Sequence, residues 1–196
     1  MTKTIEIPPG YLNIMGYVNK SQVNGPGCRA VVWVQGCHIG CADCFNPDSW
    51  PFEVRELISV EKLAENILAN PDNNGVTFTG GEPFWQAKSL ARVARIVKAS
   101  GLNVMCYTGF PLEKLQSEYA LPGSQDLLKE LDILIDDKYI KSLTETERSH
   151  SSVTSSSNQR VHIFNPIFRE KIHWGNNQVE VHHLIDGNRI GSPRLV

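Results

Sequence analysis

The segment Gln35–Cys44 reads QGCHIGCADC and directly follows an apolar stretch, Ala30–Val34, that is typical of a buried strand. It places three cysteines, Cys37, Cys41 and Cys44, in the spacing C-x3-C-x2-C. Iron–sulfur clusters are held by cysteine thiolates, usually four, so three thiolates on one loop can bind three irons of a cubane and leave the fourth without a protein ligand. An open position on a metal centre is typical of catalytic rather than structural sites.

A tetrahedral zinc site is the first alternative for this loop. It needs four nitrogen or sulfur ligands, commonly two pairs set apart in the chain. His38 directly follows Cys37, so the two side chains cannot easily reach one ion together, and Cys28 and Cys106 are single. A disulfide framework is the second alternative, but an odd count of five cysteines and the absence of a secretory pattern at the N-terminus argue against it.

A second motif lies downstream, where residues 76–83 read VTFTGGEP. A short apolar strand is followed by two glycines, which let a backbone approach a ligand closely. Glu82 is an anionic acceptor suited to an ammonium group. Alone, this sequence indicates an ordinary turn. After a three-cysteine loop, it is a much more specific indication of a ligand-binding site.

Together the two motifs resemble those of the radical S-adenosylmethionine (SAM) superfamily, in which the amino and carboxylate groups of the methionine moiety chelate the open iron. The resemblance implies that Cys37, Cys41 and Cys44 hold a [4Fe-4S] cluster and that SAM is the second cofactor. It also implies that the strand end before Pro83 contacts the methionine amino group.

Further segments, in the same order, are similar to those of one branch, the activating proteins of anaerobic ribonucleoside-triphosphate reductase. The similarity extends over roughly residues 11–165, and its segments are 24–29 (NGPGCR), 44–47 (CFNP), 107–110 (YTGF), 134–140 (LIDDKYI) and 156–160 (SSNQR). It implies an enzyme that takes an electron from a flavodoxin- or ferredoxin-like donor and cleaves SAM to methionine and a 5′-deoxyadenosyl radical. That radical would abstract a Cα hydrogen from a glycine of a glycyl-radical partner, here the anaerobic ribonucleotide reductase.

The resemblance also implies a set of SAM contacts. Members of the superfamily often have an aromatic residue before the third cysteine, where this chain has Asp43, so we expect the segment from Asp43 to Phe45 to face the adenine. Lys138 is the candidate for the methionine carboxylate, with Asp136 ordering the same edge, and Asp137 stands where a glycine is more usual. The expected cofactor-binding residues are Asp43, Phe45, Thr79, Gly80, Gly81, Glu82, Tyr107, Thr108, Asp136 and Lys138.

Two other functions stay open. One is a radical SAM enzyme that acts on a different protein or on a small molecule. The other is a metal-binding module without catalytic activity, which SAM cleavage would exclude.

Strands alternate with helices along the chain, which predicts an α/β fold of βα units around a parallel sheet. The expected strands are residues 11–20, 29–35, 75–79, 102–107 and 133–135, and the expected helices are 60–68, 84–100, 111–119 and 124–131. Ligands bind beyond the carboxyl ends of such strands, where all the motif loops lie. A closed (β/α)8 barrel typically needs ~250 residues, so this chain of 196 residues predicts an incomplete (β/α) barrel.

We expect the partial barrel to occupy residues 1–165. Residues 166–196 are expected to form a C-terminal extension packed on the same domain, with a β-hairpin whose first strand is 178–185 and whose second begins at 188. The serine-rich segment 150–157 predicts a flexible loop or an insertion.

The net charge and the hydropathy of the chain limit the partners and the cellular setting that we expect. The net charge of −2 gives no long-range attraction to phosphate backbones, so a nucleic-acid partner is not expected. No stretch approaches the roughly 18 apolar residues of a membrane span, and the N-terminus has no signal-peptide pattern. We expect a cytoplasmic, reducing setting, which free thiols and an exposed cluster both need.

Overall fold

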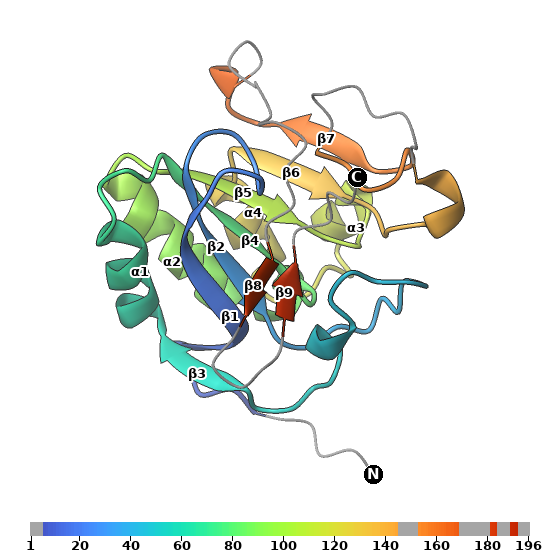
Figure 1. Cartoon of the computed structure of the whole chain (residues 1–196), viewed down its shortest axis with the longest axis horizontal. Helices are drawn as coiled ribbons and strands as arrows, with labels where there is room; N and C mark the ends of the chain where they lie inside the picture. The colour runs from blue at the N-terminus through green and yellow to red at the C-terminus, as the bar shows by residue number, and fades with distance from the viewer. Residues whose placement is uncertain (1–5, 145–152, 169–180, 184–188, 192–196) are drawn as a thin grey trace.

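The protein is described by a computed structural model in residues 6–144, 153–168, 181–183 and 189–191. Seven strands form one mixed sheet with the order β3-β1-β2-β4-β5-β6-β7 (Figure 1). The strands are β1 (Tyr11–Ser21), β2 (Arg29–Val34), β3 (Glu56–Ser59), β4 (Gly75–Gly80), β5 (Asn103–Tyr107), β6 (Ile133–Asp136) and β7 (Arg160–Ile163).

The centre of this sheet is parallel, as the alternating strands and helices predict. Strand β4 pairs in parallel with both β2 and β5, and β5 pairs in parallel with β6. The outer strands β1, β3 and β7 run antiparallel to their neighbours. In the described part of the chain no pairing joins β3 to β7, so the sheet has two edges.

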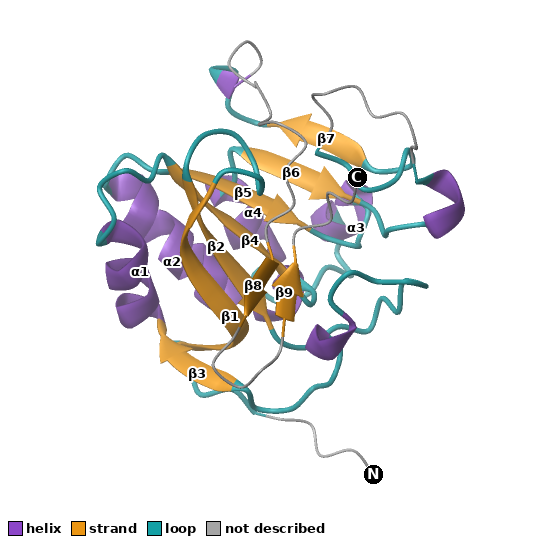
Figure 2. Cartoon of the chain, in the orientation of Figure 1, coloured by secondary structure: helices purple, strands orange, loops and turns teal. Residues whose placement is uncertain are grey.

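The helices cover one face of the sheet (Figure 2). They are α1 (Val60–Leu68), α2 (Ala87–Ala99), α3 (Leu112–Gln116) and α4 (Ser124–Glu130), with 3-10 turns η1 (Pro47–Ser49), η2 (Pro83–Gln86) and η3 (Lys141–Leu143). Helix α1 begins as predicted, because the Ser59 hydroxyl accepts a hydrogen bond from the Lys62 amide at 3.1 Å.

Two helix predictions need correction. The segment predicted as one helix over 84–100 is divided into η2 and α2, with Gln86 as the N-cap residue of α2. Helix α3 ends at Gln116, three residues earlier than predicted, because Ser117 adopts an extended backbone. Strands β3 and β7 are additional elements that the hydrophobic pattern did not indicate.

The main core lies between the helices and one face of the sheet. Its fully buried side chains come from both layers, including Leu63 of α1, Leu90 of α2 and Phe78 of β4. Burying a side chain of this size stabilises a fold by roughly 1.5–3 kcal/mol, so this interface is the main source of stability for the sheet edge that carries the site.

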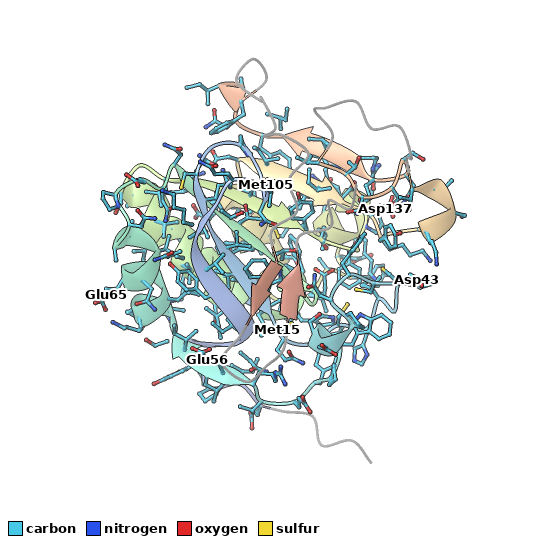
Figure 3. The ribbon with its side chains drawn as sticks, in the orientation of Figure 1. Met15, Asp43, Glu56, Glu65, Met105 and Asp137 are labelled. Carbon is cyan, nitrogen blue, oxygen red and sulfur yellow. The ribbon has the colours of Figure 1, made fainter. Side chains whose placement is uncertain are left out.

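The opposite face of the sheet carries two smaller apolar clusters. One contains Met15 and Trp33, and the other contains Met105 together with Val153 (Figure 3). Val153 is 4% exposed and Ser156 is 1% exposed. Within the segment predicted as a flexible loop or an insertion, Val153, Ser155 and Ser156 are therefore buried and Ser157 is exposed; residues 150–152 lie outside the described residues.

Two short strands, β8 (Val181–His183) and β9 (Arg189–Gly191), pair antiparallel in a separate sheet. Figure 1 draws this pair in front of the central strands. The segment that joins the two strands lies outside the described residues, so the boundary at residue 165 and the predicted hairpin stay predictions. Among the described residues, no helix is both long enough and apolar enough to cross a bilayer.

Candidate cofactor site

The loops after β2, β4, β5 and β6 meet in one cleft at the carboxyl edge of the parallel strands. The cleft has about 800 Å³ of empty space, part of it open solvent. Figure 3 shows Asp43 and Asp137, which belong to two of these loops, on the same side of the molecule. This is the edge of a parallel α/β sheet where ligands usually bind.

Most of the predicted site residues line this cleft, and two do not. The predicted residues in its wall are Cys37, Cys41, Cys44, Phe45, Thr79, Gly80, Gly81, Glu82, Tyr107, Thr108 and Lys138. Asp43 and Asp136 are absent from the wall. The structure thus brings together residues that are up to 101 positions apart in the chain (from Cys37 to Lys138).

The cysteine loop leaves β2 through Gly36, whose φ of +102° is in the region that favours glycine. The loop is tied to the segment around η1. The Gly36 amide donates to the Ser49 carbonyl at 2.7 Å, and the Cys37 amide donates to the Trp50 carbonyl at 3.1 Å. These bonds fix the start of the loop above the end of β2.

The three cysteines are half-buried free thiols that face the cleft. Backbone amides donate to two of the sulfurs, from Ile39 to Cys37 Sγ and from Asn46 to Cys44 Sγ, each at 3.4 Å. Hydrogen bonds to the sulfurs are one of the means by which proteins tune the potential of an iron–sulfur cluster.

A single zinc ion and an iron–sulfur cluster require different arrangements of the thiols. Among the described residues, no three Cys, His, Asp or Glu side chains converge on one point that could hold a metal ion. A mononuclear zinc site needs all its sulfurs about 2.3 Å from one ion. In a cubane each thiolate binds a different iron, so the sulfurs stand farther apart. Cys37, Cys41 and Cys44 would supply the three thiolates of a cubane whose fourth iron has no protein ligand.

Burial disfavours ionisation of two of the thiols. Burial, with a smaller contribution from the nearby Glu82 carboxylate, raises the pKa of Cys37 to about 11 against the lowering effect of backbone hydrogen bonds. Burial also raises the pKa of Cys41. Coordination by metal deprotonates a thiol outright, so a bound cluster would favour the thiolate form of these cysteines.

Glu82 is the buried acid of the cleft, with only 1% of its surface exposed. Its Oε1 accepts from the Phe84 amide at 3.0 Å and from the Thr108 hydroxyl at 2.8 Å, and its Oε2 accepts from the Gly109 amide at 2.8 Å. Burial raises its pKa to about 7 because these three hydrogen bonds only partly replace the lost hydration. An ammonium group in the cleft would stabilise the ionised form.

The two glycines before Glu82 have a packing role as well as a place in the cleft wall. A Cβ at Gly80, where φ is +98°, would lie 2.6 Å from Trp33 Cα. A Cβ at Gly81 would lie 2.5 Å from the Gly36 carbonyl oxygen. Close approach to the neighbouring strand and cysteine loop, and not only to a ligand, therefore requires glycine at both positions.

The Asp136 carboxylate is fully buried and faces away from the cleft. Burial alone would raise its pKa, but hydrogen bonds from Arg160 and the Leu112 amide, together with the nearby His162, outweigh burial and hold the pKa below its usual value. Asp136 thus joins β6 to β7 and to the start of α3. Any effect on a cofactor is indirect, through the next residues of the loop.

The Asp43 side chain lies outside the cleft wall, although its neighbours line it. It is 58% exposed, has a φ of +56°, and forms an ion pair with Lys141 at 3.1 Å. Phe45 is in the wall, where its ring lies 5.1 Å from the Tyr139 ring. Within the segment from Asp43 to Phe45, the aromatic side chain of Phe45 lines the cleft, and its contact with adenine stays a prediction.

The cleft wall also includes residues that the sequence did not single out as a site. They are Asn24, Trp33, Ile39, Asn46, Trp50, Gly109, Asp137, Tyr139, Ser155 and Gln159. Seven of them lie within the segments quoted above, so position in a motif was the available indication: Asn24, Ile39, Asn46, Gly109, Asp137, Tyr139 and Gln159. Nothing in the composition of the serine-rich segment indicated that Ser155 would reach the cleft.

Residues 23–162 match the family described as "4Fe-4S single cluster domain". The match takes in most of the chain, including the whole cysteine loop and all the strands from β2 to β6. The chain therefore belongs to this family, which is of radical SAM type. The description of this family and the three half-buried thiols of the cleft both indicate an iron–sulfur protein.

Two relatives are activating proteins. The pyruvate formate-lyase-activating enzyme of Clostridium pasteurianum is 29% identical over 137 residues, which cover 65% of this chain and 54% of that enzyme. The anaerobic ribonucleoside-triphosphate reductase-activating protein of Enterobacteria phage T4 is 31% identical over 127 residues, which cover 62% of this chain and 77% of that protein. The chain thus spans about half the length of the Clostridium enzyme.

One solved structure is also similar. QueE from Escherichia coli is 17% identical, with a TM-score of 0.40 over 62% of this chain and 68% of the QueE chain.

Proposed function

We propose that this chain is a radical SAM activase that generates a glycyl radical on anaerobic ribonucleoside-triphosphate reductase. Cys37, Cys41 and Cys44 would hold a [4Fe-4S] cluster whose fourth iron is open to SAM. The observation that carries the proposal is the meeting of this cysteine loop with the Glu82 strand end in one cleft. The family match supports the same cofactor.

Each part of the cleft has a role in this proposal. When bound, the cluster supplies the electron that cleaves SAM, and the resulting radical removes a hydrogen from a glycine of the partner. The buried Glu82 carboxylate would accept the methionine ammonium, since an opposite charge favours the ionised form of a desolvated acid. Lys138, in the wall of the same cleft, would pair with the methionine carboxylate.

The cleft would also shield the chemistry from water. Trp33 and Phe45 contribute apolar surface to its wall, and the cysteines are only half exposed. In cofactor enzymes the protein contributes binding, orientation and exclusion of competing reactions. The open, partly parallel sheet supports an incomplete (β/α) barrel as the frame for this cleft.

The choice of partner rests on the relatives. The match takes in 77% of the phage T4 reductase activator but 54% of the Clostridium lyase activator. The series of motif segments supports the same choice. Pyruvate formate-lyase is the second candidate target, because the Clostridium enzyme is almost as similar in sequence. A flavodoxin- or ferredoxin-like electron donor and a reducing, cytoplasmic setting complete the proposal, and five free cysteines support that setting.

Electron paramagnetic resonance can test the target. The cluster-loaded protein would be incubated without oxygen with SAM, a reductant and either an anaerobic ribonucleotide reductase or a pyruvate formate-lyase from the same source. We expect a glycyl radical doublet on the reductase that is lost when its radical glycine is replaced by alanine. A doublet only on the lyase would move the function to the second candidate. SAM cleavage with no radical on either protein would mean that the substrate is neither of these two proteins.

A further inference from the structure

The loop that carries Lys138 is fastened by a neighbouring segment from outside the parallel strands. This segment, residues 155–159, is called the bracket here. Gln159 Nε2 donates to the Asp137 carbonyl at 3.0 Å, and Asn158 Nδ2 donates to the Lys138 carbonyl at 2.9 Å. Two successive carbonyls of the loop are therefore bound by two successive side-chain amides.

The bracket is itself fixed by internal hydrogen bonds. Gln159 Oε1 accepts from the Ser155 amide at 2.6 Å and from the Ser156 amide at 3.3 Å. The Ser156 hydroxyl donates to Asn158 Oδ1 at 2.7 Å and accepts from the Ile140 amide at 3.2 Å. Ser155 and Ser156 are 6% and 1% exposed. The bracket is thus a packed polar unit that binds both ends of the segment from Asp137 to Ile140.

The loop needs such support because its backbone is unusual. Asp137 has a φ of +76°, a conformation that residues other than glycine rarely adopt. Such a conformation persists only where the surroundings impose it. If Asp137 relaxed to a negative φ, the following residue, Lys138, would leave its place in the cleft wall. The Asp137 carbonyl that Gln159 binds lies next to this strained bond.

We propose that Gln159 and Asn158 are positioning residues that set the direction of Lys138 into the cofactor cleft. They act on the backbone of the loop, and Lys138 makes the contact with the carboxylate of SAM. The inference rests on the proposed function for its ligand. The fastening of the loop itself can be measured in protein without any cofactor.

Gln159→Glu isolates one contact of the bracket. Glutamate keeps an oxygen opposite the two serine amides but places a second oxygen, instead of an N–H donor, against the Asp137 carbonyl. Asn158→Ala removes the bond to the Lys138 carbonyl and is the second variant. Gln125→Glu is the matched control, because Gln125 Nε2 also donates to a backbone carbonyl, that of Leu115 at 2.9 Å, and is not part of the cleft wall.

The first readout is hydrogen exchange in cluster-free protein, followed on a peptide that covers residues 137–143. We expect both bracket variants to exchange about fivefold faster at this peptide, corresponding to the loss of one hydrogen bond. We expect Gln125→Glu to exchange there like the wild type. Unchanged exchange in both bracket variants would overturn the inference, whatever the protein binds.

The second readout is the dissociation constant for SAM in cluster-loaded protein. We expect Gln159→Glu to raise it about fivefold. We also expect Lys138→Met to raise it, and Gln159→Glu to add less than about twofold in the Lys138→Met background, because non-additivity marks two residues that act through one contact. Equal effects in both backgrounds would overturn the positioning role. If the wild type takes up a cluster but binds no SAM, the proposed function is overturned. The exchange result would still report on the fastening of the loop.

Discussion

At the residue scale, Glu82 connects the fold to the chemistry. It caps η2 through the Phe84 amide and binds the hydroxyl and amide that follow β5. The sequence identified Glu82 as an ammonium acceptor but not as a link between two strand ends. Its complete burial could not be predicted, because burial depends on how β4 and β5 lie side by side.

Glu82 should make stability depend on pH in the cluster-free protein. Burial raises its pKa in the folded state from 4.5 to about 7. Between these values the folded protein holds a proton that the unfolded chain has lost, so rising pH favours unfolding. We expect the stability of wild type relative to Glu82→Gln to fall by up to about 3 kcal/mol between pH 4.5 and 7.5, at 1.36 kcal/mol per pKa unit.

Chemical denaturation at several pH values measures this difference. The control is Glu65→Gln, the same substitution on the exposed surface of α1 (Figure 3). Parallel stability curves for wild type and Glu82→Gln would show that the carboxyl of Glu82 does not titrate in this window, and would contradict the account of its burial.

At the scale of elements, the sequence predicted the features that depend on interactions between residues close together in the chain. The central strands, the cap at Ser59 and the end of α2 two residues before Gly101 follow from hydrophobic period, hydrogen bonding and backbone freedom within a few residues. Strands β3 and β7 depend on pairing with distant partners. The sequence RVHI of β7 alternates polar and apolar residues over only four positions, and its burial does not follow this alternation, because both the arginine and the valine are exposed.

The packing of β4 against β2 gives a prediction at this scale. Gly80→Ala combines a strained φ of +98° with a Cβ only 2.6 Å from Trp33 Cα and Val34 N. We expect a loss of unfolding free energy of about 3 kcal/mol, from backbone strain together with overpacking. Thermal or urea denaturation of the cluster-free protein measures it.

Gly101→Ala is the control for the backbone term. Gly101 also has a positive φ, of +89°, but a Cβ there would meet no atom within 4 Å. We expect a smaller loss, of about 1 kcal/mol, from the left-handed conformation alone. Equal losses in the two variants would mean that close approach of the strands does not require glycine at position 80.

At the scale of the whole molecule, the sequence predicted where the site would be. Loops that follow parallel strands must meet at one edge, so the motifs alone placed Cys37, Glu82 and Lys138 together. The sequence could not predict that Ser155 would reach the cleft wall. Serine-rich composition indicated flexibility, whereas the serine hydroxyls and amides bind neighbouring backbone and side chains in a packed unit.

The central claim is that the three-cysteine loop makes this protein a radical SAM enzyme. The most direct test reconstitutes the protein with iron and sulfide without oxygen, adds dithionite and SAM, and measures 5′-deoxyadenosine by mass spectrometry. Cys41→Ala is compared with Cys28→Ala, since Cys28 is also a half-buried free thiol but lies outside the cleft wall.

We expect 5′-deoxyadenosine from the wild type and from Cys28→Ala, and none above background from Cys41→Ala. A protein that binds zinc stoichiometrically, takes up no cluster and forms no 5′-deoxyadenosine would contradict the account and leave a metal-binding module without catalytic activity.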